Sequence, residues 1–100
     1  MFGLAPKDLI TIENLLIQPL KKEHCQLFVF GSRARGDHQK FSDLDVLIVA
    51  SDNLEKIKAH LSLIQEQLEE SELPIKVDIV LEQELAHSYR TNVLKDMIEI

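Results

Sequence analysis

Three short apolar runs, separated by polar segments, constrain the fold of this chain more than any other feature. They contain many β-branched or aromatic residues and occupy residues 27–30, 46–49 and 74–81. Runs of this length and composition are typical of buried strands. The segments between them space their apolar residues as helices do. We therefore expect an α/β fold, with a small mixed β-sheet flanked by helices.

The ends of the first two runs carry a distinctive set of small and acidic residues. Gly31-Ser32 ends the first run, and Asp43 and Asp45 stand at the start of the second. A strand that passes through Gly-Ser into a short helix leaves backbone N–H groups free to cradle a phosphate. Because side chains two apart in a strand share a face, Asp43 and Asp45 form a carboxylate pair that suits hard divalent cations.

A third carboxylate, Asp78, interrupts the last apolar run. Burying an unpaired Asp is costly, so this residue calls for a partner or a ligand. If its strand lies beside the strand of Asp43 and Asp45, the three carboxylates converge as in a two-metal phosphoryl-transfer site. The alternative is structural: Asp43 and Asp45 would face water at a strand end, and Asp78 would protect an exposed sheet edge.

Together these residues carry a resemblance to a known family. Gly31-Ser32, ten residues, Asp43-x-Asp45 and a later Asp78 resemble the signature of the DNA polymerase β-type nucleotidyltransferases. The segments GSRARG, SDLDVLI and VDIV resemble its minimal nucleotidyltransferase branch, and the resemblance covers nearly the whole chain. It implies a nucleotidyltransferase fold, ATP as the nucleotide substrate and two Mg²⁺ ions.

The resemblance also implies roles for individual residues. Catalysis and metal binding fall to Asp43, Asp45 and Asp78. The residues expected to bind the nucleotide are Gly31, Ser32, Arg33, Arg35 and Ser42. Arg33 and Arg35 alternate along the chain, so we expect one of them to face the site; the alternative for Arg35 is a pair with a structural carboxylate. The alternative for Ser32 is a helix N-cap.

The minimal branch is known as the partner of HEPN-domain toxins, which implies an antitoxin of the type VII kind that adds AMP to a toxin tyrosine. Two other functions remain open. One is a catalytically silent antitoxin that masks its toxin by binding, although the complete set of three carboxylates argues against it. The other is transfer to a small aminoglycoside-like acceptor, although we expect no second domain to form such a pocket.

Composition limits the class of protein. One hundred residues with 45% hydrophobic content suffice for one domain, residues 1–100, and no run approaches the length of a membrane span. The single cysteine, Cys25, fits a reducing cytoplasm and a packed, unreactive side chain. With 11 basic and 17 acidic residues the net charge is −6, which argues against extended nucleic-acid binding and favours a basic protein partner.

The apolar spacing predicts three longer helices. The first spans residues 7–18 and is kinked or ended by Pro19. The next starts at a capping-box-like segment, residues 52–55, and ends near Ser71. The last covers residues 83–97. The side chains expected to face inward from this last helix are Leu85, Tyr89, Val93 and Met97.

Overall fold

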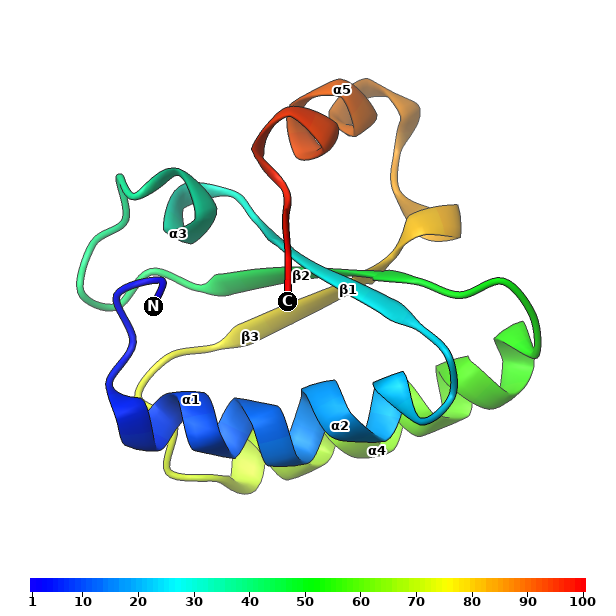
Figure 1. The fold of residues 1–100 in the computed structure, drawn as a ribbon, viewed down its shortest axis with the longest axis horizontal. Coiled ribbons are helices and arrows are strands. Elements are labelled where there is room, and N and C mark those ends of the chain that lie inside the picture. Colours follow the sequence, from blue (N-terminus) through cyan, green and yellow to red (C-terminus); the bar gives the residue numbers. More distant parts are fainter.

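A four-stranded mixed β-sheet forms the centre of the computed structural model, which describes all residues from 1 to 100 (Figure 1). The strands are β1 (Gln26–Phe30), β2 (Leu44–Val49), β3 (Val77–Leu81) and β4 (Ile98–Glu99). Their order is β3-β2-β1-β4; β1 is antiparallel to β2 and β4, whereas β2 and β3 run parallel. The predicted mixed sheet is confirmed, and β4 is a strand that the sequence analysis does not predict.

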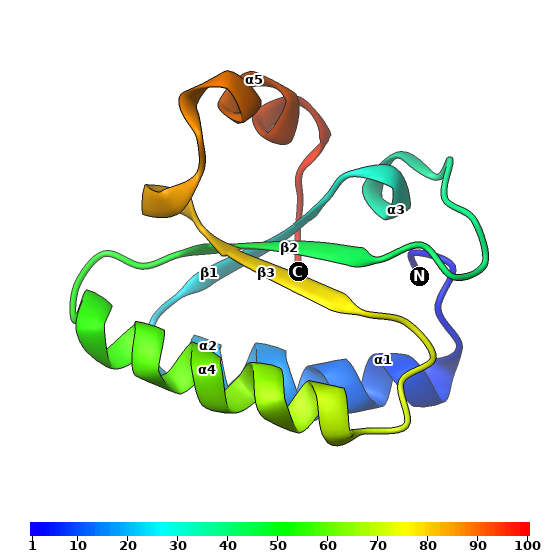
Figure 2. The same cartoon turned by 180° about the vertical axis from the view of Figure 1, so that it is seen from behind.

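The helices lie on both sides of this sheet. One face is covered by a long helical segment, made of α1 (Pro6–Ile12), η1 (Glu13–Ile17) and α2 (Gln18–Lys21), together with α4 (Leu54–Glu70). The other face carries α3 (Ser32–Arg35), the 3-10 turn η2 (Glu82–Glu84) and α5 (His87–Asp96), as the view from behind also shows (Figure 2). None of these helices is both long and apolar enough to cross a membrane.

Alternate strand residues build the core. The buried side chains on the helix-covered face of the sheet are Leu27, Val29, Leu44, Val46, Ile48, Val77 and Leu81. Buried residues of the covering helices pack with them, among them Leu16, Ile57 and Ile64. Because strand side chains alternate between faces, Asp45 and Asp78 are directed to the opposite face of the sheet.

The first helix continues past Pro19, so of the predicted kink or end at this residue the end does not occur. A π-helical turn, η1, stands directly before α2, and Pro19 occupies the first turn of α2. A proline lacks the N–H of a regular helical bond and its ring collides with the carbonyl four residues earlier. The wider π turn removes the need for that bond, and the helix therefore runs on to Lys21.

Two other helix predictions differ from the structure. Asn53 before α4 has a left-handed backbone (φ 53°) and makes no side-chain cap bond, so the predicted capping box does not form. The predicted helix of residues 83–97 is shorter: η2 precedes it, and α5 begins at His87. Val93 of α5 is buried as predicted, but Tyr89 is 64% exposed, because the free side of α5 has no element packed against it.

Candidate functional site

The strand register brings two of the predicted carboxylates together. Asp45 on β2 is the register partner of Asp78 on the parallel strand β3. On its other side Asp45 is the register partner of Phe30, the last residue of β1. The three residues thus form a row across the sheet on the face that lies opposite the main core. Asp43 precedes β2 by one residue and is exposed.

Gly31 makes the close approach between β1 and this row possible. Its backbone has φ +77°, a conformation that side chains with a Cβ rarely adopt. A Cβ built on Gly31 would lie 2.5 Å from Oδ2 of Asp45. The Asp45 carboxylate therefore lies directly against the Gly31 backbone. The Gly-Ser turn after β1 and the carboxylate of β2 are thus neighbours, as expected from the sequence.

The charged groups around Asp45 change the pKa of its carboxyl group. The pKa of Asp45 is raised, first by its partial burial and then by the negative charges of Asp78 and Asp43; the positive charge of Arg35 opposes the rise. Asp45 is half-buried, whereas Asp43 and Asp78 are exposed. All three carboxylates thus lie within electrostatic reach of one another, and Asp45 is the most affected.

The donor chemistry of this cluster fits a hard divalent cation such as Mg²⁺. Carboxylate oxygens are its preferred ligands in proteins, and a cation would relieve the mutual repulsion that raises the pKa of Asp45. With the side chains as they stand, no three His, Cys, Asp or Glu residues are close enough together to hold a metal ion. Asp43 and Asp78 would therefore have to turn toward Asp45 to share an ion, which their exposure permits.

The short helix α3 starts at the same place. Gly31 is its N-cap residue, and Ser32 is its first helical residue, so Ser32 is not the N-cap. The Ser32 hydroxyl makes no hydrogen bond within the chain, while its carbonyl accepts bonds from the N–H groups of Gly36 and Asp37. The hydroxyl is thus available to a ligand beside Asp45.

Arg33 is buried and has a structural role. It is 3% exposed, and its guanidinium donates to three backbone carbonyls: Nε to Ser42 at 2.9 Å, Nη1 to Phe2 at 2.8 Å and Nη2 to Lys40 at 3.1 Å. These bonds join the N-terminal segment to the loop before β2. The expected phosphate contact from Arg33 disagrees with this burial, because each guanidinium nitrogen already has a carbonyl partner.

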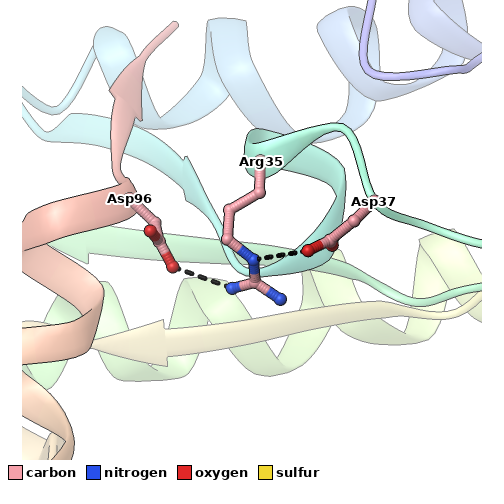
Figure 3. Close-up of polar contacts among 3 residues, drawn as sticks. All are labelled: Arg35, Asp37 and Asp96. Carbon is pink, nitrogen blue, oxygen red and sulfur yellow. Dashed lines mark hydrogen bonds and ion pairs between the residues drawn. The ribbon is translucent and has the colours of Figure 1, made fainter.

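Arg35 points the other way and bridges α3 to α5 (Figure 3). Its Nε donates to Asp37 at 3.0 Å and its Nη1 donates to Asp96 at 2.8 Å. These bonds raise the pKa of Arg35. Arg35 therefore does pair with structural carboxylates, the alternative raised by the sequence, and it also lies near enough to Asp45 to lower the pKa of that carboxyl.

The loop before β2 holds the remaining candidate. The Ser42 hydroxyl accepts a bond from the N–H of Gln39 at 2.8 Å, and the Ser42 carbonyl is held by Arg33. Ser42 thus shapes the loop that leads into Asp43. Lys40 lies over the exposed ring of Phe41, 5.3 Å from its centroid, and is directed to solvent.

Sequence reasoning missed Asp96, the α5 partner of Arg35. The two residues are 61 positions apart, and an acidic residue near the end of a predicted helix gives no signal of such a contact.

Two other residues lie away from the site. Cys25 is buried as predicted, and burial raises the pKa of its thiol. His60 bonds to Glu23 at 3.0 Å between α4 and the segment before β1, so it holds the fold together away from the site.

The sequence matches known proteins over most of its length. The nucleotidyltransferase domain family matches this chain over residues 12–100. A protein of Haemophilus influenzae named probable protein adenylyltransferase MntA is 31% identical over 71 residues, which are 71% of this chain and 60% of that protein. The protein adenylyltransferase MntA of Thermococcus cleftensis is 29% identical over an alignment of 101 positions, covering 92% of this chain and 98% of that protein.

Two solved structures have the same fold. One, assigned to a minimal nucleotidyltransferase, has a TM-score of 0.60 and 30% identity and covers 92% of this chain and 91% of its own. The other is the crystal structure of a toxin–antitoxin with AMP-PNP, with a TM-score of 0.65, 24% identity and coverage of 87% of this chain and 70% of its own. At that identity the second match concerns the fold alone.

Proposed function

Because this chain belongs to the nucleotidyltransferase domain family and to its minimal branch, we propose that it transfers AMP from ATP to a hydroxyl group of a partner protein. The observation that carries the proposal is the register pair of Asp45 and Asp78 beside the Gly31 turn. Similarity to two proteins named protein adenylyltransferase supports a protein acceptor. The chain spans 60% of the length of the Haemophilus influenzae relative, and we therefore give the protein acceptor as part of this proposal.

In the proposed reaction the acceptor oxygen attacks the α-phosphorus of ATP. The bond between that phosphorus and the β-phosphate oxygen breaks, pyrophosphate leaves, and the hydroxyl proton passes to a site carboxylate. Asp78 suits this last role, because it is exposed on the edge strand β3, where a bulky protein acceptor can approach. The free Ser32 hydroxyl and the backbone of the Gly31 turn would contact the phosphates.

Asp43, Asp45 and Asp78 would hold Mg²⁺, two ions if the chain follows its superfamily. When bound, such ions polarise the phosphates and lower the pKa of the attacking hydroxyl. Asp45 would stay central to the site, since its carboxylate is fixed against Gly31 and is affected by the charges of both other carboxylates.

We further propose that the acceptor is a tyrosine of a HEPN-type toxin and that the transfer neutralises the toxin, as the resemblance to the minimal branch implies. The net charge of −6 supports a basic partner. A cytoplasmic location accords with the single reduced cysteine.

The test is the intact mass of the protein encoded next to this one after incubation with this chain, ATP and Mg²⁺. We expect a gain of one or more AMP units. Asp78→Asn should lower the transfer rate by about 10²- to 10⁴-fold, the usual contribution of a positioned acid–base group, and Asp45→Asn should abolish transfer because it removes a proposed metal ligand. Asp52→Asn changes an exposed carboxylate two residues before α4; it is the matched control and should transfer normally. EDTA should abolish transfer.

Three results would contradict the proposal in different ways. Complex formation without a mass change would favour the masking antitoxin. Transfer to aminoglycoside-like compounds, without transfer to the protein, would favour a small-molecule enzyme. Full activity of both Asp45→Asn and Asp78→Asn would remove the carboxylates from the mechanism.

A further inference from the structure

An open apolar groove lies on the core side of the sheet, between the first helical segment and β4. Its volume is about 760 Å³, and 11 of its 14 lining residues are hydrophobic. Leu44 lines this groove, whereas the next residue, Asp45, is directed to the opposite face. The groove and the carboxylates therefore share the start of β2 but open on different sides of the molecule.

Several exposed apolar side chains line the groove. Of the seven large hydrophobic residues that are exposed, Met1 (78%), Ile10 (61%) and Ile98 (44%) all line it. They come from three separate segments: the N-terminus, α1 and β4. Single exposed apolar residues are common, but a contiguous apolar surface marks an interaction site. The fold has thus brought the N-terminal part of the chain and the distant strand β4 together around one hydrophobic surface.

The ionisable side chains that line the groove are both acidic. They belong to Glu13 and Glu99, and no Lys, Arg or His side chain lines the groove. The whole chain carries a net charge of −6. A second copy of this chain would bring the same two glutamates and the same net charge to the interface, and like charges repel. An occupant with positive charges beside its apolar residues complements the groove.

The shape of the groove favours a helix over a strand. One wall is a run of helical turns, on which Leu9, Glu13 and Ile17 stand at four-residue spacing. Strand addition would need a long free sheet edge, and β4 has two residues. We propose that this groove docks an amphipathic helix of a partner protein, with its apolar side chains in the groove and lysine or arginine side chains beside Glu13 and Glu99.

This docking goes beyond the proposed transfer reaction, because it uses none of the site residues and requires no nucleotide. A partner helix held in the groove would lie against the strand end that carries Asp43 and Asp45. The partner would then be held by one surface of this chain while an acceptor group reaches the other.

The experiment uses two fluorescein-labelled synthetic helical peptides of equal length, one of leucine and lysine, the other of leucine and glutamate in the same positions. Fluorescence anisotropy should show that the lysine peptide binds this chain and the glutamate peptide does not. Ile10→Glu should weaken binding of the lysine peptide by about tenfold or more, because it places a charge among the apolar lining residues. Leu63→Glu is the matched control: Leu63 is 51% exposed on α4, outside the groove.

The control separates groove binding from general attraction to an acidic protein, since Ile10→Glu and Leu63→Glu each add one negative charge. A second variant, Glu99→Lys, should weaken binding of the lysine peptide and strengthen binding of the glutamate peptide. Equal binding of both peptides, or equal effects of Ile10→Glu and Leu63→Glu, would overturn the proposal. So would self-association of the wild-type chain that Ile10→Glu abolishes, because a second copy would then fill the groove. Binding of ATP should be the same in Ile10→Glu and wild type, which keeps this test separate from that of the transfer function.

Discussion

Asp45 and Asp78 are direct register partners on neighbouring parallel strands, with their side chains on the same face of the sheet. Two carboxylates in this arrangement repel each other, and one of them, Asp45, is also half-buried. A fold selected for stability alone would gain by replacing either one. Their pairing therefore supports a functional role, and it leads to predictions that separate the needs of the site from those of the fold.

The first prediction concerns pH. The pKa of Asp45 is raised in the folded chain, so between the ordinary carboxyl pKa and the raised value the folded state binds more protons than the unfolded state. The free energy of unfolding should therefore fall as pH rises through this window, and this cost should remain at neutral pH. Asp45→Asn should remove the dependence, making the variant at least as stable as the wild type at pH 7. Thermal melts of both proteins across the acidic range would check this, and parallel pH profiles would contradict it.

The second prediction compares two glycines with positive φ. Gly31→Ala should cost on the order of 1–3 kcal/mol from backbone strain and should also abolish transfer, because the new Cβ would displace the Asp45 carboxylate. Gly36 has a similar φ of +87°, but a Cβ added to it would have no other atom within 4 Å. Gly36→Ala should cost about 1–2 kcal/mol and keep its activity. Urea unfolding and transfer rates should be measured for both variants. Similar activity of Gly31→Ala and Gly36→Ala would show that the Asp45 carboxylate does not lie against Gly31.

The third prediction concerns the buried guanidinium of Arg33. Arg33→Met leaves the carbonyls of Phe2, Lys40 and Ser42 without their donor. Hydrogen bonds from a charged donor contribute roughly 1.5–3 kcal/mol each, and the methionine no longer buries a charge, so we expect a net loss of about 3 kcal/mol. Arg90→Met removes a partly exposed arginine of α5 whose side chain makes no hydrogen bond or ion pair, and it should change urea unfolding much less. If Arg33→Met weakened ATP binding without destabilising the chain, a phosphate role for Arg33 would be restored.

The fourth prediction concerns Arg35, whose positive charge opposes the rise in the pKa of Asp45. Arg35→Gln should raise the pKa of Asp45 further, and Asp96→Asn, which leaves the arginine charge in place, should change it less. The NMR signal of the Asp45 carboxyl carbon, followed through a pH titration, reports this difference directly.

Arg35→Gln and Asp96→Asn should have one effect in common, because each breaks the bond between α3 and α5 (Figure 3). Amide hydrogen exchange in α5 should therefore become faster in both variants. Unchanged exchange in both would show that this ion pair does not hold α5 in place.

Much of the fold could be predicted because it depends on local patterns. The continuous apolar runs of β1 and β2 indicate strands that are buried on both faces, and the stripe through Ile57, Ile64 and Leu68 specifies the buried side of α4. The sequence indicates that Asp45 and Asp78 come together if their two strands are neighbours, and the register confirms that they are. Each of these inferences rests on the fixed repeat of a strand or helix.

The incorrect predictions arose where distant segments or unusual turns decide the outcome. Pro19 does not end its helix because a π turn accommodates it. The predicted capping box before α4 is absent because Asn53 adopts a left-handed conformation. Tyr89 is exposed because no element packs on its side of α5, and a sequence repeat does not reveal whether a helix has one neighbour or two.

The sequence by itself determined β1, β2, β3 and most of the helical segments, because hydrophobic repeats act over a few residues; the Gly-Ser and Asp-x-Asp spacing likewise pointed to the carboxylates that we propose for the site. Only the tertiary structure decided which arginine is buried: Arg33 binds the carbonyl of Phe2, 31 positions away, and Arg35 binds Asp96. It also decided that β4 pairs with β1 and closes one side of the apolar groove. Such contacts depend on how whole elements pack, since the free energy of burying a charge or an apolar side chain is set by neighbours that are far away in the sequence.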